Sequence, residues 1–219
     1  MKQNRSQFFR KCAGMTLPEL MIASTLGAVV IAMAAVFLVQ GVRYSLKTQS
    51  VSENELIEWG IYSHLTIDSR AANGMAIYAN FLPASYADST KRLGDEKRGN
   101  FLVLSCSSNK TGAQKPYISS LICYLYSEPT PGAGTFKRCI FTVPTSEQQN
   151  TLEKILNDHY NEFGFSTVAD SLTAPNGSAF VNRSTKLKSA VLNLQVTKGS
   201  SVTKTSSSKL IETAFYVRG

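Results

Sequence analysis

The stretch that decides the fold is LMIASTLGAVVIAMAAVFLVQGV, residues 20–42, which contains no charged residue. As a helix rising 1.5 Å per residue, it is about 35 Å long and can cross the ~30 Å hydrocarbon core of a bilayer. Residues 1–14 hold four basic residues and no acid, and basic residues before an apolar run favour a cytoplasmic N-terminus. This pattern predicts a membrane anchor that leaves the bulk of the chain on the far side.

A secretory signal peptide that is later removed is the alternative. Ala32-Met33-Ala34 matches a small-residue cleavage site, and the residues from Leu20 onward could form the apolar region before it. The apolar run continues through Val36–Val39, beyond that cleavage site, which favours the anchor. Spacing alone leaves both interpretations open.

Glu19 distinguishes them, because a carboxylate at the start of an apolar helix is costly to bury and usually has a functional partner. The surrounding string, CAGMTLPELMIA at residues 12–23, closely resembles the prepilin signature of type IV pilins and type II secretion pseudopilins. In that family a basic leader ends in Gly, and an N-methylated residue, Thr-Leu and Glu open a long apolar helix. The chain departs from the pattern at Met15, where Phe is commonest, and at Pro18, where an aliphatic residue is usual; Pro is tolerated in a first helical turn.

The resemblance implies that prepilin peptidase cleaves between Gly14 and Met15 on the cytoplasmic side and that Met15 is N-methylated. It makes residues 1–14 a leader peptide and residues 15–42 a transmembrane and later filament-core helix. Glu19 is then the assembly residue: paired with the Met15 ammonium of a neighbouring subunit, it would offset desolvation and fix the axial register. The implied partners are other pilin or pseudopilin subunits, prepilin peptidase and an inner-membrane assembly platform, with the head in the periplasm.

Beyond Arg43 the sequence becomes amphipathic, with apolar residues at three- and four-residue spacings, and Asn73-Gly74 is the first good stop signal. This predicts one helix from about Pro18 to Ala72, whose continuation over residues 43–74 packs on a sheet. Trp59 and the tyrosines of this helix are expected on the packing face.

Residues 75–219 are expected to form an extracytoplasmic β-sheet head, which gives an α+β fold with a pilin-like antiparallel sheet. Residues 75–98 are expected to be an exposed loop whose charge run, Lys91–Arg98, is solvated. Five strands and one short helix are predicted from residue type and bounding turn signals. The strands are Phe101–Ser105, Ser119–Tyr126, Phe136–Val143, about Ser189–Thr197 and Lys209–Val217, and the helix is Ser146–Tyr160.

Three short stretches resemble the J-type pseudopilins and the PilW-like minor pilins. They are Ile67-Asp68-Ser69-Arg70, the pair Cys123-Tyr124-Leu125 and Phe136-Lys137-Arg138, and Phe215-Tyr216-Val217-Arg218. Each is weak alone, and their order along the chain carries the resemblance.

Cleavage after Gly14 would remove Cys12 and leave Cys106, Cys123 and Cys139. If the hairpin is centred on Pro131, residues whose numbers sum to 262 face each other, so Cys123 opposes Cys139. A non-hydrogen-bonded pair at ~4.5 Å between Cα atoms is at the short end of the disulfide range. We expect a Cys123–Cys139 disulfide in an oxidising compartment, with a bridge through Cys106 or three free thiols as alternatives.

A net charge of +8 suggests a polyanion binder, but the charge is divided: +4 in residues 1–14, −2 in 15–182 and +6 in 183–219. The alternative function is therefore a pilin-like subunit that captures DNA or a surface ligand through its basic C-terminal third. No metal-ligand spacing, nucleophile motif or phosphate loop occurs in the sequence. We expect a structural subunit of a pilus or pseudopilus, with no catalytic residues, no metal and no cofactor.

Overall fold

The computed structural model describes residues 16–108, 117–130, 133–196 and 209–217. It divides into two compact units, residues 1–48 and 49–219. Helix α1, Leu17–Ala71, contributes to both units, and each unit is considered by itself. In the first unit the described residues are helical from Leu17 onward and all but Leu46 are exposed.

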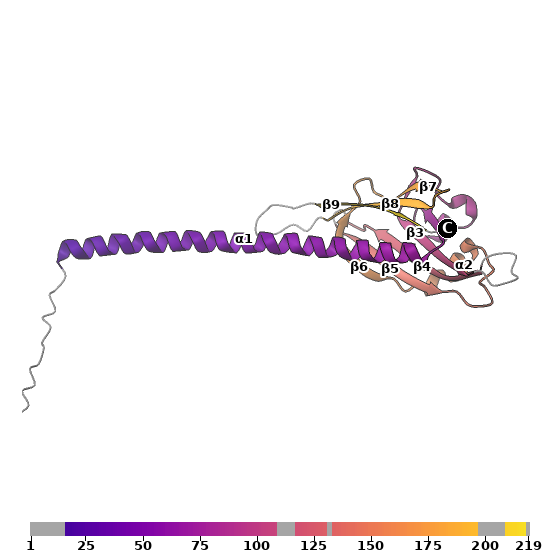
Figure 1. Cartoon of the computed structure of the whole chain (residues 1–219), viewed down its shortest axis with the longest axis horizontal. Coiled ribbons are helices and arrows are strands. Elements are labelled where there is room, and N and C mark those ends of the chain that lie inside the picture. The colour runs from indigo at the N-terminus through magenta and orange to yellow at the C-terminus, as the bar shows by residue number, and fades with distance from the viewer. Residues whose placement is uncertain (1–15, 109–116, 131–132, 197–208, 218–219) are drawn as a thin grey trace, which may run out of the picture. The chain divides into compact units, whose positions relative to one another are not determined.

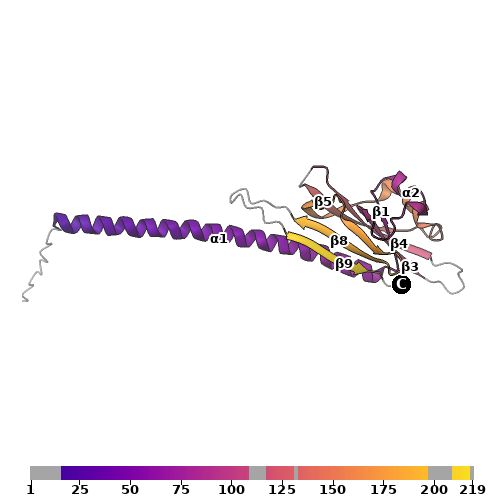
Figure 2. The same cartoon turned by 90° about the horizontal axis from the view of Figure 1, so that it is seen from above.

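In the second unit the final part of α1 packs against the sheet (Figures 1 and 2). Ile61 and Leu65 are fully buried, Ala72 just beyond the helix is 2% exposed, and Ile57 packs beside them. Burying each large aliphatic side chain contributes roughly 1.5–3 kcal/mol, so this stripe is what holds the helix against the sheet. The predicted stop signal is confirmed, since the helix ends at Ala71.

The prediction that Trp59 packs on the sheet is wrong. Trp59 is 71% exposed and Leu56 is 70% exposed, whereas Ile61 is fully buried. Two residues along an α-helix correspond to a turn of about 200°, so Trp59 and Ile61 must lie on opposite sides. The helix buries the narrow stripe of aliphatic and small residues and leaves the bulkier aromatic ring outside.

The sheet is antiparallel throughout, in the order β1-β3-β4-β5-β6-β8-β7-β2, with β9 paired to β8. Together with the helix it confirms the α+β class. The described strands are β1 Gly74–Tyr78, β2 Arg98–Gly99, β3 Phe101–Ser108, β4 Tyr117–Ser127, β5 Gly134–Thr142, β6 Ser166–Thr173, β7 Phe180–Ser184, β8 Ser189–Val196 and β9 Lys209–Tyr216.

Two apolar clusters cover opposite faces of the sheet. The first lies beneath α1 and includes Tyr124, Phe136 and Leu192. The second lies beneath the short helix α2, Leu152–Asp158, and is rich in aromatic rings: Phe81 stacks on Tyr160 with ring centroids 4.9 Å apart. Residues 101–104 of β3 and residues 121–124 of β4 are therefore buried on both faces, which explains why these two stretches are continuous apolar runs.

The predicted register of the β4–β5 hairpin is confirmed. Ile122 pairs with Ile140 and Cys123 with Cys139, so paired numbers sum to 262. The N–H of Val143 donates to the Ser119 carbonyl at 3.0 Å, which makes 119/143 a hydrogen-bonded pair. Because the two kinds of pair alternate, 123/139 is also a hydrogen-bonded pair and not the closer, non-hydrogen-bonded pair that the sequence suggested.

Residues 75–98 are more ordered than the predicted loop. They include most of β1, the 3₁₀ turns Pro83–Ser85 and Ser89–Lys91, and the start of β2. Strands β6 and β7 were not predicted, because their short, polar sequences lack strong strand signals. The predicted helix at Ser146–Tyr160 is shorter in the structure, because residues 144–150 form turns and Thr151 caps α2 by accepting from the Lys154 N–H.

Candidate functional site

The start of α1 is fixed by one half of a capping box, in which the side chain of Glu19 returns to Thr16. Oε2 of Glu19 accepts from the Thr16 backbone N–H and from the Thr16 hydroxyl, both at 2.9 Å. This arrangement satisfies a free helix donor and fixes the carboxylate at the first turn. Oε1 of Glu19 accepts no hydrogen bond from the described residues, so it is available to a partner. Gly14 and Met15, the predicted cleavage and methylation residues, lie outside the described residues.

After Glu19, α1 presents an apolar surface. Twenty of the twenty-five exposed large hydrophobic side chains in the described residues are on this helix. The hydroxyls of Ser24 and Thr25 donate to the carbonyls of Met21 and Ile22 at 2.9 Å, so their polar atoms are satisfied within the helix. By length and composition the helix can cross a membrane.

The end of α1 is fixed to the sheet by an ion pair. The Arg138 Nε and a terminal guanidinium nitrogen donate to the two carboxylate oxygens of Asp68 at 2.6 and 2.7 Å, and the Tyr124 hydroxyl also donates to Asp68. The Asp68 side chain is 5% exposed and that of Arg138 is 21% exposed. The bond to Asp68, although opposed by burial, raises the pKa of Arg138, so the guanidinium stays charged.

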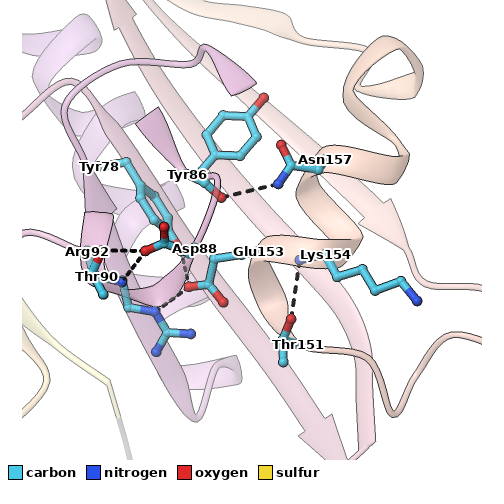
Figure 3. Close-up of polar contacts among 9 residues, drawn as sticks. All are labelled: Tyr78, Tyr86, Asp88, Thr90, Arg92, Thr151, Glu153, Lys154 and Asn157. Carbon is cyan, nitrogen blue, oxygen red and sulfur yellow. Dashed lines mark hydrogen bonds and ion pairs between the residues drawn. The ribbon is translucent and has the colours of Figure 1, made fainter. Parts of the chain in front are cut away.

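A second cluster of the same composition fixes α2 to β1 (Figure 3). The Arg92 Nε donates to Glu153 Oε1 at 2.5 Å and the Tyr78 hydroxyl donates to the same oxygen at 2.9 Å. Burial acts to raise the pKa of Glu153, but the hydrogen bonds from Arg92, the backbone and Tyr78 outweigh it and lower that pKa. The nearby turn is capped by Asp88, which accepts from the Thr90 N–H at 2.8 Å.

A comparison with family models identifies the N-terminal segment. The prokaryotic N-terminal methylation motif matches residues 9–35. The chain carries this methylation motif. The match covers the leader end, Glu19 and the apolar run, and it supports the type IV pilin and pseudopilin family that the sequence suggested. Comparisons with curated proteins and with solved structures found no match.

The motif and the apolar helix together support membrane anchoring followed by assembly with other pilin-like subunits. The capping box lies within the matched residues, so the methylation motif has a defined local structure from Thr16 onward. Pilin-family subunits are structural rather than catalytic. Among the described residues, no group of three His, Cys, Asp or Glu side chains could hold a metal ion.

In the head that follows the motif, Cys106, Cys123 and Cys139 are free thiols. Cys123 is fully buried and Cys139 is 5% exposed, and both belong to the cluster beneath α2. Burial raises the pKa of both thiols. Opposed Cβ atoms of a hydrogen-bonded pair are about 5.5 Å apart, beyond the ~4.5 Å limit of disulfides, so a bridge would need a small backbone shift. The Cys123–Cys139 disulfide stays a prediction.

The basic C-terminal third does not form a uniform basic face in the residues described. A terminal nitrogen of Arg183 contacts Glu96 at 3.2 Å and Lys188 Nζ donates to the Asn73 carbonyl at 2.6 Å. Lys198 and Lys204 lie outside the described residues.

The cluster at Glu153 was not predicted from the sequence. The charge run Lys91–Arg98 was expected to be solvated, whereas Arg92 binds buried Glu153 and Asp95 Oδ1 accepts from the Thr185 N–H at 2.6 Å. The available signal was the apolar pattern of α2, which places Glu153 between buried Leu152 and Ile155 and so demands a cationic partner.

Proposed function

We propose that this chain is a minor pilin or pseudopilin, a structural subunit of a type IV pilus or a type II secretion pseudopilus. It is made as a prepilin, cleaved between Gly14 and Met15 by prepilin peptidase and methylated at Met15. The observation that carries the proposal is a capping-box carboxylate, Glu19, at the start of a long exposed apolar helix inside the matched methylation motif.

The geometry of Glu19 supports its role in assembly. One carboxylate oxygen holds the helix start, while the other projects from an apolar surface that a membrane or neighbouring helices would surround. In that low-dielectric setting a carboxylate needs a cation, and cleavage before Met15 creates an ammonium one helical turn away in each subunit. Pairing between subunits neutralises both charges and sets their axial offset.

The resemblance to the J-type pseudopilin and PilW-like subgroup gains support from the head. Two of the three stretches that suggested this subgroup supply Asp68 and Arg138, which are 70 residues apart and form a bidentate ion pair. The acid of the helix and the basic residue of the hairpin therefore act together to fix the helix to the sheet. We propose that the head is periplasmic before assembly and lies at or near the filament tip.

Processing is tested by intact-mass analysis and N-terminal sequencing of the protein from a host that expresses prepilin peptidase. The expected mature chain begins at Met15 and carries one N-terminal methyl group. A chain that still begins at Met1, or that begins after Ala34, would contradict the proposal.

Assembly is tested by Glu19→Ala, with Glu55→Ala as the matched control. Both remove an exposed carboxylate from α1, but only Glu19 lies in the methylation motif. Glu19→Ala is expected to insert in the membrane normally and to be absent from sheared filaments or from complexes with partner subunits, whereas Glu55→Ala assembles. Normal assembly of Glu19→Ala would refute the role of this carboxylate.

A further inference from the structure

A groove of about 690 Å³ lies between the outer edge of β1 and the end of β7. The two ends of the sheet approach each other at β2, which pairs with β7, and the Asn100 N–H donates to the Ala79 carbonyl at 2.9 Å beside it. Away from β2 the two strands separate. The groove occupies this separation, and Arg92 and Glu153 at its rim are seen in Figure 3.

One wall of the groove is an open strand edge. The Ile77 carbonyl points away from β3, because it accepts from the Leu93 N–H at 2.8 Å. Alternate residues of a strand direct their backbone groups the same way, so the N–H and carbonyl of Met75 also face outward. Met75 lines the groove, and in the described residues its backbone makes no hydrogen bond outside the strand ladder. An open edge of this kind can accept an added strand.

The opposite wall holds a buried acceptor without a partner. Asn182 is 3% exposed and lines the groove, and within the described residues its Oδ1 accepts no hydrogen bond. The amide orientation is fixed, since Nδ2 donates to the Leu93 carbonyl at 2.7 Å and the flipped amide would oppose two oxygens. A buried amide oxygen requires a donor, and a ligand N–H in the groove would supply one.

The rim of the groove is positively charged. Arg92 uses Nε to bind Glu153, which leaves its terminal nitrogens outside that bond, and its side chain is 44% exposed. Lys188 lines the groove as well. Among the described residues of the lining, Glu153 is the one acid and it is paired with Arg92, so Lys188 is the charge that a negative group on a ligand would find uncompensated.

We propose that this groove binds an extended, acidic peptide segment of a neighbouring subunit, which adds to β1 as a strand. The N–H and carbonyl groups of an extended peptide point alternately to its two edges. Those on one edge pair with Met75, and an N–H on the other edge donates to Asn182 Oδ1. An acidic side chain of the segment then lies near Lys188. The groove is lined by residues 74–77 of β1, but the outward carbonyl of Ile77 is already bonded to Leu93, so the added segment pairs through the N–H and carbonyl of Met75. The choice of a subunit as the source rests on the proposed function.

The test uses the full-length chain in assembling cells, with a photo-reactive amino acid at one of three positions. Thr185 is an exposed residue of the groove, Ile140 is an exposed residue of β5 outside the groove lining, and Ile31 on the apolar helix reports assembly itself. Thr185 is expected to cross-link to an acidic, extended segment of another subunit, identified by mass spectrometry, and Ile140 is not.

Two variants test the contacts. Met75→Pro removes the outward N–H and is expected to lower the Thr185 cross-link by about fivefold, the value of one hydrogen bond, while Met75→Leu keeps the N–H and the cross-link. Lys188→Gln removes a rim charge but retains a donor for the Asn73 carbonyl, and it is expected to lower the yield without altering the fold. The Ile31 cross-link should persist in all three.

If the cross-link yield from Thr185 is no higher than that from Ile140 while the Ile31 cross-link is intact, the proposal that the groove binds a peptide is overturned. The proposed function is not affected by that result. A Thr185 cross-link to a protein that is not a subunit would overturn the assigned source. Loss of the Ile31 cross-link in the parent chain would instead count against assembly, and with it against a subunit as the ligand. If the Thr185 cross-link yield of Met75→Pro and of Lys188→Gln equals that of Met75→Leu and of the parent chain, both the strand addition and the charge contact are overturned.

Discussion

Replacing Asp68 by alanine should separate the end of α1 from its anchor on the sheet. Asp68 accepts three hydrogen bonds, two from Arg138 and one from Tyr124, and its side chain is 5% exposed. The substitution removes the carboxylate and leaves a guanidinium in a site where water reaches only 21% of the side chain. The Tyr124 hydroxyl loses its acceptor at the same time.

The cost follows from the burial of the partners. Removing one member of a buried, hydrogen-bonded ion pair costs about 3–5 kcal/mol, because the remaining charge is uncompensated. The exposed pair of Arg183 and Glu96, with side chains 51% and 65% exposed, provides the comparison. Arg183→Ala is expected to cost less than about 1 kcal/mol. In the double variant Asp68→Ala/Arg138→Met no charge is left unpaired, so it should be more stable than Asp68→Ala.

The assay is urea unfolding of the full-length chain in mild detergent, followed by near-ultraviolet circular dichroism. Tyr124 stacks on Phe136 with ring centroids 5.4 Å apart, so this signal reports packing beneath α1 and not the helix content of the anchor. With a urea dependence of roughly 2 kcal/mol per molar, Asp68→Ala should lower the midpoint by about 1.5–2.5 M. A shift no larger than that of Arg183→Ala, or a double variant less stable than Asp68→Ala, would refute this account.

Three further outcomes are expected. The hydrogen bond to Glu147, with that to Glu162, raises the pKa of His159 despite burial. The contribution of His159 to the free energy of unfolding is therefore complete below the unfolded pKa near 6.5 and is lost as pH rises through the higher folded value. Unfolding of the parent chain should consequently depend on pH more than that of His159→Gln, by under about 1 kcal/mol. Peptide mapping without reduction of periplasmic protein should recover Cys123 joined to Cys139, and finding both alkylated after unfolding would contradict this. Glu153→Ala should cost about 1–3 kcal/mol, less than Asp68→Ala, because it leaves the buried Tyr78 hydroxyl without an acceptor while Arg92, 44% exposed, is hydrated; the cost is measured as the loss of near-ultraviolet signal in urea.

Much of this fold follows from local sequence signals. The charge-free run, the capping residues and Asn73-Gly74 determine the long helix, and the proline-glycine loop determines the β4–β5 register. Strands β6 and β7 escaped prediction, because their polar residues give no clear strand pattern, although β7 pairs with β8, the next strand along the chain. Trp59 was misplaced for a different reason: spacing identifies an amphipathic helix, but both sides of this helix carry apolar residues, and periodicity cannot say which side meets the sheet.

The register nevertheless contained the means to choose between those sides. Since paired numbers sum to 262, Tyr124 opposes Arg138, and the parity set by the 119/143 pair makes theirs a non-hydrogen-bonded pair, whose side chains lie closest. Arg138 lies beside Tyr124 on the face of the sheet that α1 covers. A positive charge in that position needs an acidic partner from the helix. Asp68 is the acid on the same side of the helix as Leu65 and Ile61, which are three and seven residues away, and it therefore selects the side that excludes Trp59. The buried ion pair thus determines which side of α1 faces the sheet, which apolar periodicity alone does not. The same combination of an acid, an arginine and a tyrosine orients α2 through Glu153.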